Sequence, residues 1–400
     1  MPASPPLAVR GRRVAITGYG VVAPCGVGKD AFWRGLLGPG LTGGRSIEIA
    51  DWDPTPYFDN PKEARRADRV EQFALAAAAE CFAHAGRPDV DDTRFGTIFA
   101  TGVGGLRSTE EQIRVLVEKG ERRVSPFLVP MMMPNASGAA ISMRYGLRGP
   151  NETICTACAA STHAIGYAAR LIAWGMVDAC ITGGAESAGC DIGVASFGNM
   201  TALSTVGASR PFSPERDGFV LGEGAAVFML EEWDAAVARG AAIVGEVLGA
   251  ASNADAHHIT APAPGGTGAI ACMRAALHDA GLDASAIGHI NAHGTSTPLN
   301  DAAEAAAVSV VFGAGAVPVT STKGVTGHAL GAAGALEAAA VLLSMEHGII
   351  PPTAGTTALD DTMDIDLVIG APRPWTPGPT LSNSLGFGGH NGTIVLGPGA

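Results

Sequence analysis

The sequence predicts an α/β protein in which Ala-rich helices cover a mostly parallel sheet. Short apolar runs rich in strand-forming residues alternate with Ala-rich helical runs along all 400 residues, a pattern typical of βαβ units. A weak repeat adds to this: RFGTIFATGVGG at 94–105 resembles AIGHINAHGTST at 286–297, and HAIG at 163–166 resembles HALG at 328–331. These matches predict two similar halves, 1–240 and 241–400, although chance similarity in so Ala- and Gly-rich a chain is an alternative.

Each element is predicted from its own run of residues. The strands are expected at 14–17 (VAIT), 96–100 (GTIFA), 179–182 (ACIT), 225–230 (AAVFML), 287–292 (IGHINA), 318–321 (PVTS) and 393–396 (TIVL). The helices are expected at 71–85, 161–174, 269–280, 301–311 and 332–346. The helical segment WDAAVARGA, near residue 240, is expected to end the first half.

Composition excludes several classes of protein. The formal net charge of -12 argues against general nucleic-acid binding. Neither a signal peptide nor an apolar run of about 20 residues is visible, which predicts a cytoplasmic protein without a membrane span. The seven cysteines are scattered and odd in number, so neither a disulfide framework nor a zinc site is expected.

A first motif is misleading. Gly18, Gly20 and Ala23 follow the strand VAIT in the spacing of a dinucleotide-binding fingerprint. That fingerprint needs a helix to begin among its glycines, so that the pyrophosphate meets the helix N-terminus. Pro24 delays the next helix until about Lys29, and nucleotide binding is therefore not expected.

The segment TACAAS places Cys158 just before a predicted helix. A helix N-terminus stabilises a thiolate, so the sequence predicts a Cys158 pKa lowered from about 8.5. On this segment alone, a structural cysteine is the interpretation that the residues favour. Cys155 forms a C-x-x-C with Cys158, and a thioredoxin-like redox pair is a weaker alternative.

Three distant loops favour chemistry at Cys158. His293 follows a predicted strand, and Lys323 and His328 follow another, at strand ends where α/β proteins gather active-site groups. A cysteine at a helix start with two histidines suggests an activated nucleophile. The Gly-rich segment 384–392 around Phe387 could present backbone N–H groups to an oxyanion, or could simply form a tight turn.

Together these motifs resemble the β-ketoacyl-acyl carrier protein synthases of the thiolase-like superfamily, in particular the elongating type II enzymes of bacteria. The resemblance covers nearly the whole chain, through segments such as YGLRGPNETICTACAAS, RPFSPERDGFVLGEG, NAHGTSTPLND, STKGVTGHALGAAGALE and NSLGFGGHNG. It implies a five-layered αβαβα fold of two duplicated halves with mixed sheets, usually dimeric.

The resemblance also implies a mechanism, decarboxylative Claisen condensation. Cys158 would take an acyl chain from an acyl carrier protein, with the N–H groups of Cys158 and Phe387 holding the oxyanion. His293 and His328 would donate hydrogen bonds to a malonyl thioester as it loses carbon dioxide. Lys323 would act through the histidines, with Asp301 and Glu304 in the same polar network.

Further roles follow from the resemblance. No cofactor is required beyond the 4'-phosphopantetheine arm of the carrier, although Asn291, Glu337 and Asn383 match a structural Na⁺ or K⁺ site. The residues matched to substrate handling are Thr295, Thr297, His258 and Thr260 at the pantetheine arm, Val103 at the bottom of the acyl pocket, and Leu128 and Met132 across the dimer; for the last three, ordinary core packing is the alternative. The residues matched to carrier docking are Lys62, Arg65, Arg66, Arg122 and Arg123, and a solvated charge run is the alternative.

Two departures bear on the pathway. Relatives in fatty-acid synthesis usually carry a longer polar loop after the Leu203-Ser204-Thr205 stretch, with an arginine that is absent here. The stretch 51–80 is more similar to type II polyketide ketosynthases, which implies either a homodimer or a heterodimer with a chain-length-factor-like subunit. The competing classes are a coenzyme A-dependent thiolase-like acyltransferase, which would need a Cys-His-Cys set, and a non-catalytic chain-length factor, which would lack the cysteine.

Overall fold

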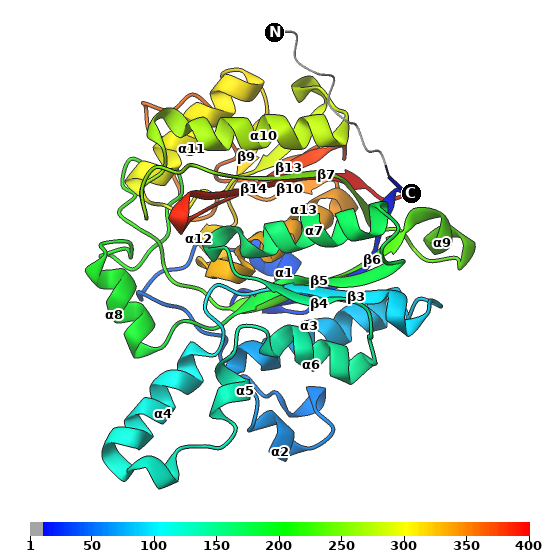
Figure 1. Ribbon diagram of the computed structural model, residues 1–400. Coiled ribbons are helices and arrows are strands. Elements are labelled where there is room, and N and C mark those ends of the chain that lie inside the picture. The colour runs from blue at the N-terminus through cyan, green and yellow to red at the C-terminus, as the bar shows by residue number, and fades with distance from the viewer. Residues whose placement is uncertain (1–10) are drawn as a thin grey trace.

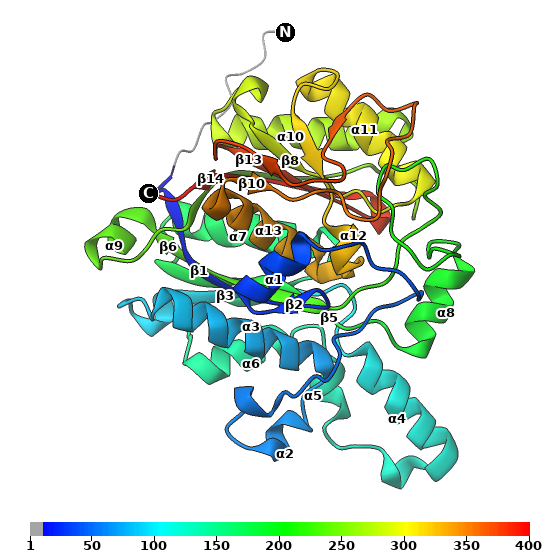
Figure 2. The same cartoon turned by 180° about the vertical axis from the view of Figure 1, so that it is seen from behind.

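The chain folds into five layers, α, β, α, β and α (Figures 1 and 2). The computed structural model describes residues 11–400. The helices of the layers are α3 (Arg69–Ala85) and α6 (Ala136–Tyr145) on one outer face, α7 (Ala160–Ala173) and α13 (Ala333–His347) in the middle, and α10 (Thr267–Ala280) and α11 (Pro298–Phe312) on the other outer face. Apart from α6, which was not predicted, each of these helices begins and ends within about two residues of its predicted bounds, except at the start of α11.

The two β layers repeat one pairing pattern. The first contains β4 (Asn151–Ile154), β3 (Phe95–Ala100), β5 (Ala179–Glu186), β6 (Gly224–Glu232) and β1 (Val14–Ala23). The second contains β9 (Pro318–Thr320), β8 (His289–Asn291), β13 (Thr380–Gly386), β14 (His390–Pro398) and β7 (Gly245–Ala254). In each set, the first two pairings are parallel and the next two are antiparallel.

The prediction of a mostly parallel sheet is therefore wrong, and the mixed sheets implied by the family resemblance are confirmed. β1 and β7 pair over two residues, Ala15 with Glu246 and Ile16 with Gly245, and this joins the two layers into one paired sheet. β2 (Gly26–Val27) pairs with β1, and β11 (Asp366–Leu367) extends the second layer beside β9.

Small residues let the middle layer pack tightly. Thirteen consecutive residues of α13, from Ala333 to Met345, are buried, and most of them are Ala or Leu. A Cβ placed on Gly334 would lie 2.0 Å from Oγ1 of Thr162 in α7, so this crossing requires glycine. Burial of both helices between the sheets gives the molecule its largest apolar core.

Several strands were not predicted, among them β4 of the first layer and β7 and β13 of the second. β7 has the sequence GEVLGAASNA and β13 has TLSNSLG, and both are rich in small and polar residues with few β-branched ones. The other helices missed by the prediction are α4 (Leu106–Lys119), α5 (Leu128–Met132) and α8 (Asp191–Asn199), which project below and beside the layers in Figure 1. The helical segment near residue 240 is α9 (Trp233–Ala238).

The glycine motif at residues 18–23 lies inside β1, and helix α1 (Lys29–Leu36) begins where it was predicted. The geometry of a dinucleotide fingerprint is therefore absent at this motif. The repeated tetrapeptides do not occupy equivalent places: His163 lies within α7, whereas His328 precedes α13 by several residues. Within residues 11–400, the search for a helix with the length and hydropathy of a membrane span finds none.

Candidate active site

Cys158 lies in a single turn of 3₁₀-helix, Ala157–Ala159, which leads directly into α7. Ala157 adopts a left-handed conformation with a φ of 50°, which is uncommon for a residue with a Cβ and is found at functional sites. Cys158 is 6% exposed and packs against Phe219, Leu221 and Leu330. The sharp turn thus presents a thiol at the start of a buried helix.

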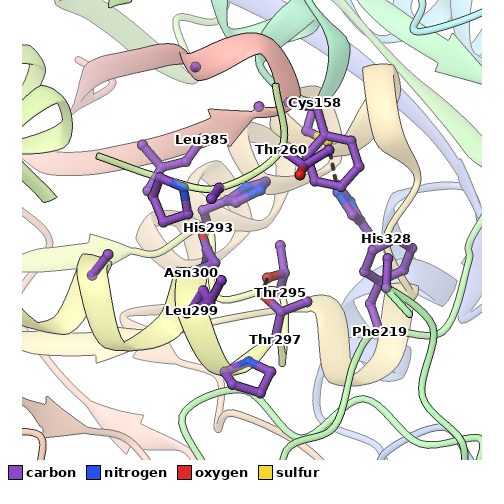
Figure 3. A pocket seen from close by; sticks show the side chains of 18 of the residues that line it. Cys158, Phe219, Thr260, His293, Thr295, Thr297, Leu299, Asn300, His328 and Leu385 are labelled. Atoms are coloured by element: carbon purple, nitrogen blue, oxygen red, sulfur yellow. Dashed lines mark hydrogen bonds between the residues drawn. The ribbon is translucent and has the colours of Figure 1, made fainter. Parts of the chain in front are cut away.

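Two histidines meet this thiol, as Figure 3 shows. Nε2 of His328 lies 3.0 Å from Sγ of Cys158. The rings of His293 and His328 are nearly perpendicular, at 83°, with their centroids 5.3 Å apart. One ligand atom from each of the three residues lies within 4.8 Å of the others, so the structure brings together a nucleophile and two imidazoles that are far apart in sequence.

Lys323, at the start of α12 (Lys323–Thr326), fixes one of these histidines. Its ammonium is fully buried, lies 3.3 Å from Nδ1 of His293 and also donates to the His293 carbonyl oxygen. It forms an ion pair with Glu337 of α13. An ammonium can only donate, so Nδ1 of His293 accepts and the proton of the neutral ring resides on Nε2.

Burial keeps the thiol of Cys158 neutral. Burial raises the pKa of Cys158 to about 11, although the Lys323 charge and the backbone N–H of Phe387 act to lower it. The predicted lowered pKa is therefore wrong for this structure, because the prediction considered the helix N-terminus without the cost of removing a thiolate from water.

The histidines are neutral for the same reason. Burial, together with the Lys323 charge, holds the pKa of both His293 and His328 well below the ordinary histidine range. Nδ1 of His328 has no hydrogen-bond partner among the described residues. The resting site is thus a neutral thiol beside a neutral imidazole.

The Gly-rich segment closes over Cys158 from the end of β13. Phe387–Gly389 form a short 3₁₀ turn, and a Cβ added to Gly386 would lie 3.1 Å from the backbone nitrogen of Cys158. The Phe387 ring contacts Phe197 of α8, with centroids 6.4 Å apart. The two turns therefore lie against each other at the thiol, in the place expected for the N–H donors of an oxyanion hole.

A pocket of about 570 Å³ opens onto the thiol. Thr295, Thr297 and Thr260, predicted to contact the pantetheine arm, all line it. His258 does not line it: this exposed side chain accepts hydrogen bonds from the backbone N–H groups of Thr260 and Ala261, both at 3.1 Å. The structure thus places His258 as a support of the loop that carries Thr260.

Val103, Leu128 and Met132 do not line this pocket within the single chain. Val103 and Met132 are exposed, at 41% and 40%, and Leu128 is half-buried. The alternative of core packing is thereby excluded for Val103 and Met132. They lie on neighbouring segments, since the N–H of Gly105 donates to the carbonyl oxygen of Met132.

Asp301 and Glu304 of α11 are buried, and they hold the backbone around His293. Glu304 accepts hydrogen bonds from the N–H groups of His293 and Gly294, both at 2.8 Å. Asp301 accepts from the N–H groups of Phe212, at 2.8 Å, and Ser296. Burial raises the pKa of Asp301 to about 6 and the pKa of Glu304 to about 7. Glu304 thus contacts the His293 backbone directly, whereas Asp301 acts farther along the loop.

The three residues matched to a cation site do not all face one another. Oδ1 of Asn291 and Oε2 of Glu337 are buried and have no hydrogen-bond partner among residues 11–400, as expected of oxygens that bind a cation. Asn291 shares a sheet face with its strand partner Ser382, and side chains alternate between faces. The side chain of Asn383 therefore points to the other face, where it contacts Met273 and Glu304.

The basic residues matched to carrier docking come together on one surface. Lys62, Arg65 and Arg66 lie in or just after α2 (Pro61–Ala64), and Arg122 and Arg123 lie in a turn before α5; all five are exposed. The Arg66 guanidinium lies 4.4 Å from the centre of the Phe127 ring, which joins the two segments. Among residues 11–400, none of the five forms an ion pair.

Sequence reasoning missed several residues around the thiol. Phe197, Phe219 and Leu330 line the pocket, and Phe219 lies edge-on to His328 at 4.9 Å. Leu330 adopts a left-handed φ of 42° two residues after His328. Glu186, fully buried at the end of β5, was also missed. Proximity to the site depends on the tertiary fold, and no local pattern signals it.

The fold and the site define a thiolase-like condensing enzyme. Comparison with known sequences is specific: the N-terminal domain of β-ketoacyl synthases matches residues 39–236, and the C-terminal domain matches residues 244–357. The chain therefore belongs to the β-ketoacyl synthase family.

Curated relatives agree over nearly the full length. The chain is 40% identical to 3-oxoacyl-[acyl-carrier-protein] synthase 2 of Synechocystis sp. and 41% identical to that of Vibrio harveyi, covering 96% of this chain and 98% of each relative.

Similar solved structures include the ishigamide ketosynthase/chain length factor, with a TM-score of 0.90 and 32% identity. Another is a β-ketoacyl synthase from Burkholderia phymatum, with a TM-score of 0.89 and 32% identity. A third is a ketosynthase in complex with its type II polyketide acyl-carrier protein, with a TM-score of 0.89 and 31% identity. Each comparison covers 97% of this chain and 99% of the other.

Proposed function

We propose that this chain is an acyl-carrier-protein-dependent β-ketoacyl synthase that extends an acyl chain on Cys158 by decarboxylative Claisen condensation with a malonyl carrier. The observation that carries the proposal is the contact of the Cys158 thiol with Nε2 of His328 at 3.0 Å, with His293 beside them, at a pocket of about 570 Å³. The first half, 1–240, supplies the nucleophile, and the second, 241–400, supplies the histidines.

The first reaction moves the acyl group. The thiol of Cys158 passes its proton to Nε2 of His328 as sulfur attacks the thioester carbon, since a thiolate held alone would be costly at this buried position. The carbonyl oxygen becomes an oxyanion near the N–H groups of Cys158 and Phe387. The new C–S bond replaces the bond to the pantetheine sulfur, which leaves with the proton from His328.

The second reaction forms the carbon–carbon bond. As the malonyl carboxylate leaves as carbon dioxide, its bonding electrons pass to the thioester carbonyl and form an enolate. The Nε2–H of His293, which Lys323 keeps on that nitrogen, donates to this oxygen. Nε2 of His328 donates as well, once the neutral ring has exchanged its Nδ1 proton with solvent for one on Nε2. The enolate carbon attacks the acyl group, the Cys158 sulfur leaves, and one proton from solvent restores the thiol.

The same geometry gives the substrates a route. Thr260, Thr295 and Thr297 offer hydroxyl groups along the pocket, which suits the amides of a pantetheine arm. The arm arrives on an acidic carrier protein, and the exposed basic surface of α2 and the turn before α5 complements that charge. Because the whole chain has a formal net charge of -12, docking of an acidic carrier requires a local basic surface.

A dimer completes the proposal. Val103 and Met132 are apolar and exposed in the single chain, as expected of residues that a partner subunit covers. The partner is either a second copy or a chain-length-factor-like subunit, and the pathway is correspondingly either fatty-acid or type II polyketide elongation. The curated relatives are 3-oxoacyl-[acyl-carrier-protein] synthases, and one similar solved structure is a ketosynthase/chain length factor, so both alternatives have support among the relatives.

The proposed chemistry requires no redox or organic cofactor, since no atom changes its partners by electron transfer and the protons come from Cys158, His328 and solvent. Asn291 and Glu337 offer two unpartnered oxygens that fit a Na⁺ or K⁺ ion. Such an ion would support Glu337 and, through it, Lys323 and His293. A cytoplasmic location stays a prediction from the sequence.

A thiolase-like acyltransferase is less well supported. That class would place a second cysteine beside the first, and among the described residues Cys158 is the one cysteine that lines the pocket. Cys155 is exposed on the other side of its turn. A chain-length factor would lack the thiol that this chain retains.

Mass spectrometry of the intact protein tests the proposal. After incubation with an acyl carrier protein loaded with a medium-length acyl chain, the wild-type chain is expected to gain the acyl mass. Cys158→Ala should gain nothing, and Cys155→Ala, a matched change three residues away, should be acylated as the wild type is. Acylation of the Cys158→Ala protein, or none of the wild type with any partner subunit, would refute the proposal.

A further inference from the structure

Glu186 is a buried carboxylate that the proposed chemistry does not use. It is the last residue of β5 and is fully buried. Among residues 11–400 it forms no ion pair with a lysine or arginine, in contrast to Glu337 beside Lys323. Burying a carboxylate is costly unless hydrogen bonds satisfy it, so its partners reveal what it supports.

Its two oxygens hold two separate segments. Oε2 accepts hydrogen bonds from the N–H of Gly102, at 2.6 Å, and from the N–H of Gly331, at 3.1 Å. Oε1 accepts from the hydroxyl of Thr101 at 3.3 Å. Thr101 and Gly102 belong to the loop between β3 and α4, and Gly331 belongs to the 3₁₀ turn Leu330–Ala332. One side chain therefore ties two loops to the end of β5.

The loop and the turn are in direct backbone contact around this carboxylate. A Cβ added to Gly102 would lie 2.5 Å from Oε2 of Glu186. A Cβ added to Gly331 would lie 2.1 Å from the backbone nitrogen of Gly102. Both positions require glycine for space, and neither segment can shift without breaking a hydrogen bond to Glu186.

Both segments border Cys158. The 3₁₀ turn begins two residues after His328, and Leu330 packs in the same apolar cluster as Cys158. The other segment ends at Leu106, the first residue of α4, which packs against that cluster from another side. The position of His328 and one apolar wall near the thiol thus depend on the same carboxylate.

We propose that Glu186 is a positioning residue for acyl transfer: its carboxylate holds the 101–105 loop and the Leu330–Ala332 turn together, and thereby sets His328 against Cys158. Gly102 and Gly331 N–H groups and the Thr101 hydroxyl all donate, so the ionised form is the one that fits. These hydrogen bonds act to lower the Glu186 pKa, which burial raises to about 7. The proposal deepens the function proposed above and rests on it.

Two changes disturb this contact in different ways. Glu186→Gln keeps the size of the side chain but replaces one acceptor oxygen with an NH₂ donor. That donor would face the N–H groups of Gly102 and Gly331 or the Thr101 hydroxyl, which also donate. Gly102→Ala leaves Glu186 intact but places a methyl group against Oε2. Glu71→Gln is the matched control, since Glu71 is a largely buried carboxylate that accepts from the N–H of Asp68 at the start of α3, outside the site.

The expected result is the same for both site variants. The rate of Cys158 acylation and kcat for condensation should fall about tenfold to a hundredfold, because a small displacement of reacting groups has a large kinetic effect. KM for the malonyl carrier should stay within about twofold, since Thr295 and Thr297 lie on another loop. Glu71→Gln should lower Tm and leave kcat near the wild-type value.

Two outcomes would overturn the proposal. One is a Glu186→Gln protein that acylates at the wild-type rate; the other is a loss of kcat in Glu71→Gln that equals the loss in Glu186→Gln at matched Tm. If Glu186→Gln failed to fold, as judged by circular dichroism, Gly102→Ala would carry the test alone. An inactive wild-type chain would instead refute the proposed function.

Discussion

At the scale of single residues, the proposed site buries two imidazoles and a thiol, all neutral, beside the ion pair of Lys323 and Glu337. Cys158 and His328 share a contact of 3.0 Å, whereas His293 is set by Lys323 and by Glu304 behind its backbone. In the proposed function the two histidines are therefore not equivalent: we expect His328 to serve the sulfur and the enolate, and His293 to serve the enolate alone.

Replacement of each histidine separates these roles. His293→Ala should still take the acyl group on Cys158 at a rate within about threefold of wild type, while condensation falls about 100-fold or more, because one donor to the enolate is lost. His328→Ala should slow both steps. Single-turnover acylation and release of carbon dioxide measure the two, and equal loss of acylation in both variants would contradict the assignment.

Single residues also show where prediction from sequence stops. The pKa of Cys158 was predicted in the wrong direction, because a helix start is visible in a sequence and burial by Phe219, Leu221 and Leu330 is not. Asn383 was grouped with Asn291 although strand alternation sends its side chain to the other face. Glu186 was missed because its partners are backbone N–H groups from distant segments.

At the scale of elements, the site is built where the turns after β13 and before α7 meet. Gly386 ends β13 against the backbone of Cys158, with a hypothetical Cβ at 3.1 Å from its nitrogen. This contact brings the N–H of Phe387 toward the thiol. The Ala-rich helices α3, α7, α10, α11 and α13 and most apolar strands could be predicted from their local patterns, whereas β7 and β13, which have few β-branched residues, could not.

Gly386→Ala tests this contact between elements. The added methyl group should displace the Phe387 turn by a few tenths of an ångström and slow Cys158 acylation about tenfold, since the oxyanion donors lose their alignment. Gly378→Ala is the matched control, because a Cβ there meets no atom within 4 Å. Acylation kinetics that do not distinguish the two variants would exclude the Phe387 turn from the oxyanion hole.

At the scale of the whole molecule, two sheets with the same pairing pattern enclose α7 and α13, and each contributes part of one site. Loops from the first set carry Cys158, and loops from the second carry His293, Lys323, His328 and Phe387. The resemblance of ordered motifs predicted this assembly. The projecting region of α4 and α5 leaves Val103 and Met132 exposed, which the monomeric chain does not explain.

Met132→Asp should therefore weaken a dimer, because a charge buried in an interface without a partner is costly. Light scattering should give twice the chain mass of 40.3 kDa for wild type and a shift toward the single-chain mass for the variant. Val310→Asp, at an exposed apolar position on α11, should leave the mass unchanged. If the protein dimerises only with a second kind of subunit, the wild-type chain measured alone should already have the mass of one chain.

The most direct test of the central claim is a comparison of decarboxylation and condensation in Cys158→Gln. This variant is expected to release carbon dioxide from a malonyl carrier at a rate no lower than wild type, because His293, His328 and Lys323 remain. No β-ketoacyl product is expected by mass spectrometry, because no sulfur is present to hold the acyl group. A β-ketoacyl product from this variant would contradict the assignment of Cys158 as the residue that holds the acyl chain during condensation.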